Sequence, residues 1–258
     1  MDNIVGTRRK WMREEIILAF EIYCTVPNQN ILNNPKVIEL SDATGHPLGS
    51  VRALLENFKS FDPNYTKNDK KGLPHGSKLA GEVASEFFDN WDSLVIEAAE
   101  IKKRYNIKPL PESITVETDI PTGYDVERAK RARCGQSFFR QTLLTNYEGR
   151  CCITGLAISD LLIASHIKPW GKSNDINEKT NPQNGLLLNP LLDLAFDKGY
   201  ITIDGDCRVI LSREIKNHAC EHTRSHFEEY NGRTITNPIR FPPGKQFIEY
   251  HNEHIFRG

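Results

Sequence analysis

The chain has 258 residues, of which 38% are hydrophobic and 26% are charged, and its formal net charge is -1. This composition is typical of a globular protein with room for two modest domains, and it excludes extensive disorder. The near-neutral charge excludes a global attraction to nucleic acid, so any DNA binding depends on local basic patches. No run of about 18 apolar residues and no apolar signal core is present, so we expect a cytoplasmic protein without a membrane contact.

The first hundred residues predict helices. Ile16, Ile17, Phe20 and Tyr23 recur at helical spacing after two acidic residues, and Pro27 ends this segment. A later stretch, from Leu79 to about Tyr105, has the same periodicity. The N-terminal part is therefore expected to be mostly helical.

Residues 34–63 predict a helix-turn-helix, because two short apolar helices flank a turn with glycine and proline. The second helix is expected to begin near Gly49 or Ser50 and to pack through an apolar stripe of Val51, Leu54, Leu55 and Phe58. Its polar positions are the candidates for DNA contact, namely Ser50, Arg52 and Lys59. The alternative is that this helix only packs within an all-helical domain that serves oligomerisation.

Three prolines and little apolar periodicity mark residues 107–124 as an interdomain linker. We therefore predict a helical, target-binding domain at residues 1–106 and a second domain at residues 125–258. The second domain mixes helices with short strands, so the expected fold class is α+β.

The second domain is expected to open with a basic helix, followed by two short strands, a helix of about two turns and a β-hairpin. Asn189 and Pro190 are good residues for the start of that helix, and Gly199 for its end. The expected elements are a helix at 126–147, strands at 150–154 and 161–166, a helix from 190 to about 198, and a hairpin at 200–211.

The order strand, strand, loop, helix puts His166 at the end of a strand and Asp193 on the helix that folds back against it. The stretches RCCITG, ASHIKPW and NPQNGLLLNPLLDLAFDKGYITI resemble the HNH endonuclease family, in a subgroup common among bacterial restriction-like proteins. The resemblance covers about residues 126–258. It implies the ββα-metal fold of that family.

The resemblance also implies roles for single residues. His166 matches the histidine that deprotonates the attacking water, and Asn184 matches the asparagine that holds the loop and so positions this histidine. Asp193 stands where a metal ligand on the helix is expected. Ser165 departs from the pattern, because many members carry a metal ligand there; the metal would then be held by Asp193 with Asp197, at i+4 on the same helix face, or by a backbone carbonyl.

Phosphodiester hydrolysis needs these residue types whatever the family. An imidazole with a pKa of ~6.5 can take a proton from water near neutral pH. A hard divalent cation bound by one or two carboxylates stabilises the charge of the transition state. We expect Mg²⁺, with Mn²⁺ as the alternative; the six cysteines include no C-x-x-C pair, so a zinc finger or ribbon is not predicted.

The leading hypothesis is a DNA endonuclease of restriction or defence type that binds double-stranded DNA. Arg133, Arg140 and Lys168 are predicted DNA contacts in the second domain. A homodimer is expected, because one active site per chain would need a second copy to cut both strands. The alternatives are a nucleic-acid-binding regulator with a degenerate nuclease site, and a toxin-like nuclease acting on RNA or on any DNA.

Overall fold

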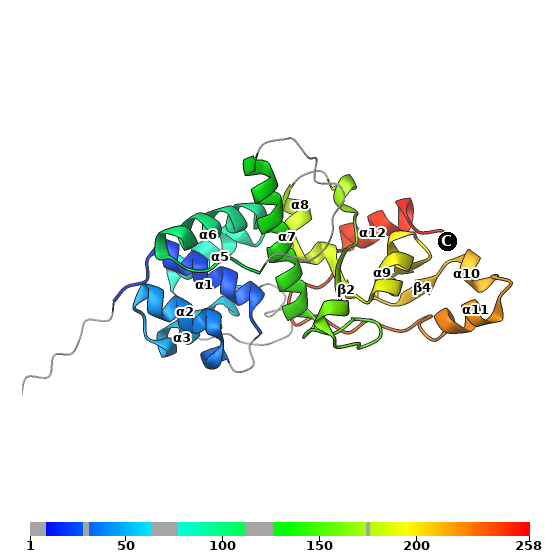
Figure 1. Cartoon of the computed structure of the whole chain (residues 1–258), viewed down its shortest axis with the longest axis horizontal. Helices are drawn as coiled ribbons and strands as arrows, with labels where there is room; N and C mark the ends of the chain where they lie inside the picture. Colours follow the sequence, from blue (N-terminus) through cyan, green and yellow to red (C-terminus); the bar gives the residue numbers. More distant parts are fainter. Residues whose placement is uncertain (1–8, 28–30, 63–76, 112–125, 174–175) are drawn as a thin grey trace, which may run out of the picture. The chain divides into compact units, whose positions relative to one another are not determined.

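The computed structural model describes residues 9–27, 31–62, 77–111, 126–173 and 176–258. The chain divides into two compact units, residues 1–109 and residues 110–258, and each is described by itself (Figure 1). The fold class is α+β, as predicted. Most of the predicted linker, residues 112–124, lies outside the described residues. In the described ranges no helix has both the length and the hydrophobicity needed to cross a bilayer.

The N-terminal unit is built around one central helix, α1, which contacts the four other α-helices described in this unit. The helices are α1 (Arg13–Thr25), α2 (Pro35–Thr44), α3 (Leu48–Phe58), α5 (Lys78–Phe87) and α6 (Trp91–Tyr105), with a short 3-10 turn, η1 (Ile31–Asn33). Every residue of α1 from Glu15 onward is buried. A helix that is apolar nearly all round is stable only in such a central position.

The buried charges of α1 are paired. Glu21 forms an ion pair of 2.5 Å with Lys102 of α6. Glu15 accepts a hydrogen bond of 2.9 Å from the backbone N–H of Met12, which satisfies one free donor at the start of the helix. These pairings allow α1 to carry carboxylates into the core, where an unpaired charge would be costly.

Helices α2 and α3 form the predicted helix-turn-helix outline. Asn34 caps α2 by accepting a hydrogen bond from Lys36 N, and Gly45 ends it in the left-handed conformation, with φ of 70°. Three residues, 45–47, separate the helices, and α3 begins at Leu48, slightly earlier than predicted. The predicted apolar stripe of α3 is buried, so its packing role is confirmed.

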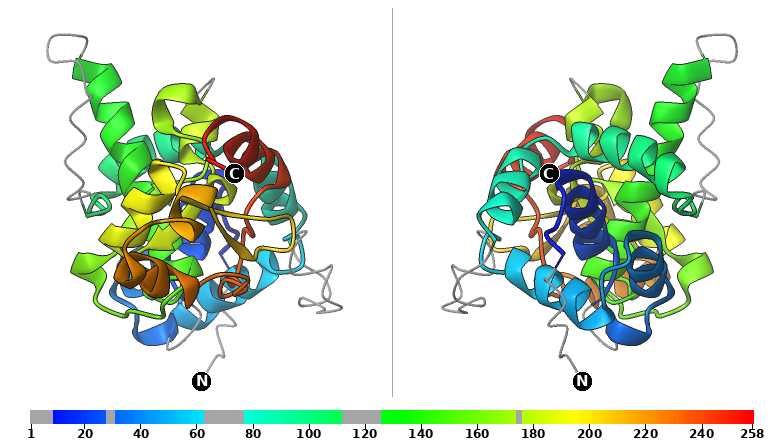
Figure 2. Two further views of the ribbon diagram at one scale, coloured as in Figure 1. Left: turned by 90° about the vertical axis from the view of Figure 1, so that its right-hand side faces the viewer. Right: turned by 90° about the vertical axis from the view of Figure 1, so that its left-hand side faces the viewer.

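The C-terminal unit holds two two-stranded antiparallel sheets among helices. The elements are α7 (Val126–Asn146), β1 (Ile163–His166), α8 (Ile176–Thr180), β2 (Gly185–Leu188), α9 (Pro190–Asp197), β3 (Ile201–Ile203), β4 (Val209–Leu211), α10 (Arg213–Lys216), α11 (Glu221–Glu228) and α12 (Lys245–His254), with 3-10 turns η2 (Ser159–Leu161), η3 (Trp170–Lys172) and η4 (Pro182–Asn184). Strand β1 pairs with β2, and β3 with β4. Helices α10 and α11, in orange in Figure 2, pack against each other.

One predicted strand is wrong. Residues 150–154 form a tight turn, in which Gly155 N bonds to Cys151 O and Cys151 N bonds to Leu156 O. Cys152 N donates to Leu187 O, so the segment contacts β2 through a backbone hydrogen bond without forming a strand. The partner of β1 is the apolar run Gly185–Leu188. All four residues of β2 are buried, which explains why the segment has no alternation of polar and apolar residues.

The helix and hairpin that follow agree with the prediction. The side chain of Asn189 accepts a hydrogen bond of 2.9 Å from Leu192 N at the start of α9, and Pro190 occupies its first position. After α9, Gly199 adopts a positive φ of 72°, where a Cβ atom would also collide with the carbonyl oxygen of Ile255. This turn sends the chain directly into the β3-β4 hairpin, which fixes α9 against the sheet that carries His166.

Candidate active site

The end of strand β1 is the centre of the candidate site. Ser165 lies opposite Leu186 and His166 lies opposite Gly185 in the antiparallel register. Successive side chains of a strand point to opposite faces. Ser165 accordingly faces α9, where it interacts with Asp193, whereas the His166 ring packs on Phe139 of α7.

The His166 ring is held by three contacts. It stacks on Phe139 with a centroid separation of 4.0 Å and an interplanar angle of 7°. The Trp170 ring lies nearly perpendicular to it, at 79°, with the two ring centroids 5.6 Å apart. Its Nε2 lies 2.9 Å from the carbonyl oxygen of Lys179. Because a carbonyl only accepts, Nε2 carries the proton and Nδ1 holds the lone pair. Nδ1 makes no hydrogen bond with the described residues.

The pKa of His166 is lowered from 6.5 to about 4. Burial is the largest cause and the charge of Lys179 adds to it, while the hydrogen bond to the Lys179 carbonyl acts in the opposite direction. The imidazole is therefore neutral at neutral pH. That is the protonation state in which it can accept a proton.

Asn184 is fully buried and joins two segments beside His166. Its Oδ1 accepts a hydrogen bond of 2.8 Å from Lys168 N, and its Nδ2 donates to Lys168 O at 3.2 Å and to Glu178 O at 3.1 Å. In addition, Ile167 N donates to the backbone oxygen of Asn184. The asparagine thus ties the chain directly after His166 to helix α8.

Asp193 and Asp197 lie one turn apart on α9, so their side chains share a face of the helix. Burial raises the pKa of Asp193, and the Ser165 side chain lowers it in part. Burial first, and then the charge of Asp193, raise the pKa of Asp197 to about 6. Two neighbouring carboxylates repel each other when both are ionised. A cation bound to them would favour their ionised forms.

Ser165 supplies a further oxygen to this pair. Ser165 is 3% exposed, and its Oγ has no hydrogen-bond partner of good geometry although it interacts with the Asp193 carboxyl. A buried hydroxyl without a full partner is an unusual feature of a folded protein. Hard cations such as Mg²⁺ take oxygen ligands, so this hydroxyl and the two carboxylates fit such an ion.

Two subsets of the predicted site are thus separated by the strand. Asp193, Asp197 and Ser165 come together on the α9 side, whereas His166 and Asn184 are anchored toward α7 and α8. No hydrogen bond or ion pair joins His166 to either aspartate, all of which belong to the described part of the chain. A groove of about 470 Å³ on the opposite flank of α9, lined by Leu191, Leu194 and Lys198 among others, includes none of these residues.

The predicted DNA contacts fall into two groups. Arg52 and Arg133 are exposed. Arg140, in contrast, donates to the carbonyl oxygens of residues 162 and 159, at 2.7 and 3.1 Å. Lys168 is buried in an ion pair of 2.7 Å with Glu178, and Lys59 pairs with a glutamate one turn away, at 2.6 Å. The last three charges therefore have partners within the protein, which the sequence did not indicate.

Three residues around His166 were missed by the sequence analysis: Phe139, Trp170 and Lys179. Trp170 lies within the ASHIKPW stretch, so its position was a usable signal. Phe139 is 27 positions before the histidine and Lys179 contributes only a backbone oxygen, and neither carries a pattern that points to His166.

The family model described as HNH endonuclease matches residues 151–204. This segment of the chain is therefore similar to the HNH endonucleases. Among the curated proteins searched, none matches the chain. All five residues of the predicted site, Ser165, His166, Asn184, Asp193 and Asp197, lie within the matched HNH segment.

HNH endonucleases are nucleases that generally use a divalent metal ion. Among the described residues, no group of three or more histidine, cysteine, aspartate or glutamate side chains could enclose such an ion. A site with two carboxylates and a hydroxyl leaves positions for water and a substrate phosphate, as is common for Mg²⁺. The oxygen atoms of Asp193, Asp197 and Ser165 are therefore suited to a hard, partly hydrated cation.

Proposed function

We propose that this chain is a metal-dependent DNA endonuclease of restriction or defence type. The observation that carries the proposal is the neutral His166 imidazole, fixed at the end of β1 within the segment that matches the HNH endonucleases. Double-stranded DNA is its substrate, the N-terminal unit binds the target, and two copies act together to cut both strands.

In this proposal His166 is the general base and its Nδ1 accepts the proton of the attacking water. A pKa of about 4 keeps the ring unprotonated but makes it a weak base. An anionic phosphate bound beside the ring would raise this pKa, because a nearby negative charge favours the imidazolium. Asn184 is a positioning residue that holds the segment after the histidine.

Asp193, Asp197 and Ser165 would hold the cation, Mg²⁺ or alternatively Mn²⁺. When bound, such an ion stabilises negative charge on the phosphorane-like transition state and on the leaving oxygen. In-line displacement places the attacking and leaving oxygens on opposite sides of phosphorus. The positions of the base and of the carboxylates on different faces of β1 suit that requirement.

Cleavage of supercoiled plasmid DNA with added Mg²⁺, and its loss in chelator, tests the activity. His166→Ala should lower the cleavage rate by ~10²–10⁴-fold while leaving DNA affinity unchanged, because it removes the base. His222→Ala, which removes an exposed histidine of the same unit, is the matched control and should cleave normally.

Wild-type activity in His166→Ala would rule out the assignment of the base. DNA binding without cleavage at any Mg²⁺ or Mn²⁺ concentration would favour the regulator with a degenerate site. Degradation of RNA in preference to DNA would favour the toxin-like nuclease.

A further inference from the structure

A pocket of about 310 Å³ lies on the N-terminal unit, and its lining includes Ser50, one of the three α3 positions predicted to touch DNA. Its walls come from three segments: Arg9, Lys10 and Trp11 precede α1, Ser50 and Asn57 belong to α3, and Ser77 is the N-cap of α5. Among the described residues, the lining includes two cations, Arg9 and Lys10, and no acidic side chain. Its size falls within the range of small-molecule pockets.

One face of α3 forms the floor of this pocket. Ser50, Ala53, Leu54 and Asn57 follow the spacing i, i+3, i+4, i+7, which places them in a single row along the helix. Leu54 is also part of the buried stripe, so the floor is fixed by the core. Ser50 is thus both a predicted DNA contact and part of the floor, whereas Arg52 lies outside this row.

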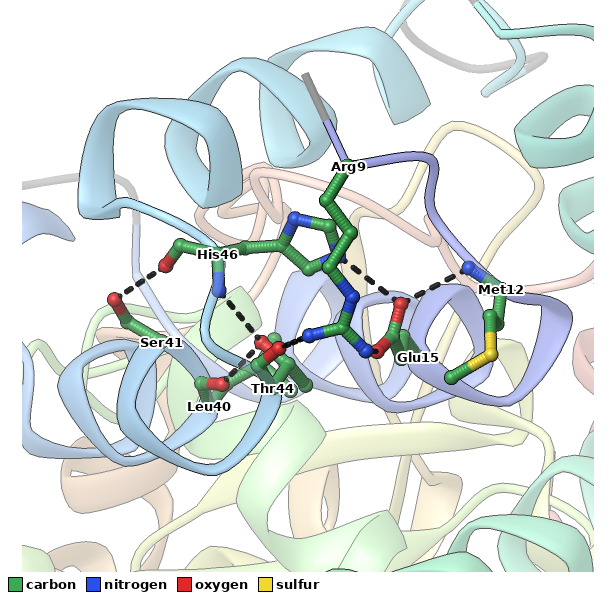
Figure 3. Close-up of polar contacts among 7 residues, drawn as sticks. All are labelled: Arg9, Met12, Glu15, Leu40, Ser41, Thr44 and His46. Carbon is green, nitrogen blue, oxygen red and sulfur yellow. Dashed lines mark hydrogen bonds and ion pairs between the residues drawn. The ribbon is translucent and has the colours of Figure 1, made fainter. Parts of the chain in front are cut away.

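The wall opposite the floor is the segment of residues 9–12, here called the arm, which Figure 3 shows converging on Glu15. The Glu15 carboxylate is fully buried and accepts hydrogen bonds from Arg9 at 2.6 Å and from Met12 N at 2.9 Å, and it lies 3.0 Å from His46 Nε2. A second nitrogen of Arg9 donates to the carbonyl oxygen of Thr44. The arm is thus bound to α1 and to the C-terminal end of α2.

Trp11 is oriented by the same network. Its ring stacks on the His46 ring with a centroid separation of 3.7 Å and an interplanar angle of 19°. Next to it, Lys10 is exposed and forms no ion pair with the described residues. The pocket consequently presents an aromatic ring with a fixed orientation, an amide at Asn57, and an available ammonium group.

We propose that this pocket binds one nucleotide, with its base against Trp11 and Asn57 and its phosphate at Lys10. Aromatic side chains stack on bases with little sequence preference, an asparagine amide can pair with the edge of a base, and lysine contacts phosphate. The inference rests on the proposed action on DNA. Because the floor is α3 of the helix-turn-helix, the favoured source is a nucleotide extruded from bound DNA, and a free nucleotide is the other source of the same chemistry.

Binding is measured with the full-length chain carrying His166→Ala, so that DNA stays intact. The first probe is a set of 30-base-pair duplexes that differ only in one nucleotide placed opposite an abasic position. The duplex with the unpaired nucleotide should bind about tenfold more tightly than the fully paired one, because its extrusion needs no base pair to be broken. Asn57→Ala and Lys10→Gln should abolish most of this preference without touching the network around Glu15.

Lys78→Gln is the matched control. It removes one positive charge beside Ser77, but its side chain is 94% exposed and does not line the pocket. This variant should keep the preference for the unpaired nucleotide. If Lys78→Gln and Lys10→Gln lose this preference equally, the preference comes from general surface charge and the proposal is overturned.

The second probe is free deoxynucleoside monophosphates, followed by tryptophan fluorescence. Quenching that disappears in Trp11→Phe, without a preference among the duplexes, would keep the nucleotide site and assign it to a free nucleotide. Equal binding of inorganic phosphate would leave only an anion site and contradict the proposal. Absence of both responses would also overturn it, while plasmid cleavage by the wild-type chain would still stand as the test of the nuclease itself.

Discussion

His166 and His251 are held in similar ways. Each ring stacks on a phenylalanine, each has Nε2 near a backbone carbonyl oxygen, and in each case burial lowers the pKa to about 4. They differ at Nδ1, which lies 2.8 Å from the Thr202 hydroxyl in His251 and has no hydrogen bond with the described residues in His166. In His166, therefore, Nδ1 is the nitrogen that is available to accept a proton from water.

Asp193→Asn should weaken Mg²⁺ binding more than Asp197→Asn does. Asp193 interacts with Ser165 and is the less exposed carboxyl. Asp197 is at the surface, and its pKa is raised to about 6. Titration of Mg²⁺ in the cleavage assay should show a rise in the half-activating concentration of about tenfold or more for Asp193→Asn and a smaller one for Asp197→Asn. The reverse order would make Asp197 the main ligand, and no change in either would place the ligands elsewhere.

Asn184→Ala should destabilise the protein by about 3 kcal/mol, because it removes three hydrogen bonds of a buried side chain and leaves their partners unsatisfied. It should also lower the cleavage rate at a temperature where the variant is fully folded, since the segment after His166 loses its anchor. Urea unfolding and single-turnover cleavage at 15 °C separate the two effects. A folded variant with normal cleavage would reduce Asn184 to a structural residue.

The sequence made the motif residues of the site predictable, because His166, Asn184 and Asp193 stand at recognisable positions in short stretches. The structural roles of Arg140 and Lys168 could not be predicted, since their partners are a pair of carbonyl groups and a glutamate that only the fold brings near. The network of Glu15 and His46 was equally hidden, because these residues are 31 positions apart.

At the scale of elements, helices were more predictable than strands. The start of α9 was predictable from the sequence because Asn189 and Pro190 act locally, within a few residues of the backbone groups that they affect. The partner of β1 depends instead on a pairing across the chain, from Ile163 to Leu188. Residues 150–154 have a strand-like composition, but a local turn that includes Gly155 competes for their backbone groups and prevails.

His251 links three elements of the C-terminal unit and should make its stability depend on pH. From α12 the ring contacts Phe196 of α9 and Thr202 of β3. Its pKa is about 4 in the folded state and 6.5 when unperturbed, so the unfolded chain binds more protons between these values. Stability therefore falls as pH decreases from 6.5 to 4, and is retained above that window.

Urea unfolding at pH 7 and pH 4.5 measures this effect. The wild-type protein should lose about 2 kcal/mol more on acidification than His251→Gln, which cannot titrate. The raised pKa of Asp197 contributes with the opposite sign, but it does so in both proteins and cancels in the comparison. Identical pH dependence in the two proteins would show that His251 is not a source of acid sensitivity.

At the scale of the whole molecule, each unit has its own hydrophobic core. The core of the C-terminal unit draws on α7, the β1-β2 pair, α9, the β3-β4 hairpin and α12, and all of its members lie between Phe139 and Ile248. The N-terminal unit closes around α1. A chain with two self-contained cores is expected to tolerate separation of its parts.

Residues 125–258 should therefore fold alone and cut DNA weakly, without sequence preference. All five residues of the proposed active site are retained, whereas α3, Arg52 and the nucleotide pocket are lost. The dependence of DNA affinity on salt should also become shallower, by roughly one unit of slope for each phosphate contact removed. Circular dichroism establishes folding, and mapping the ends of digested genomic DNA compares the selectivity of the truncated and full-length chains. If the truncated protein keeps the full selectivity, the N-terminal unit is not the reader; a simultaneous loss of dimers in solution would then assign it to oligomerisation.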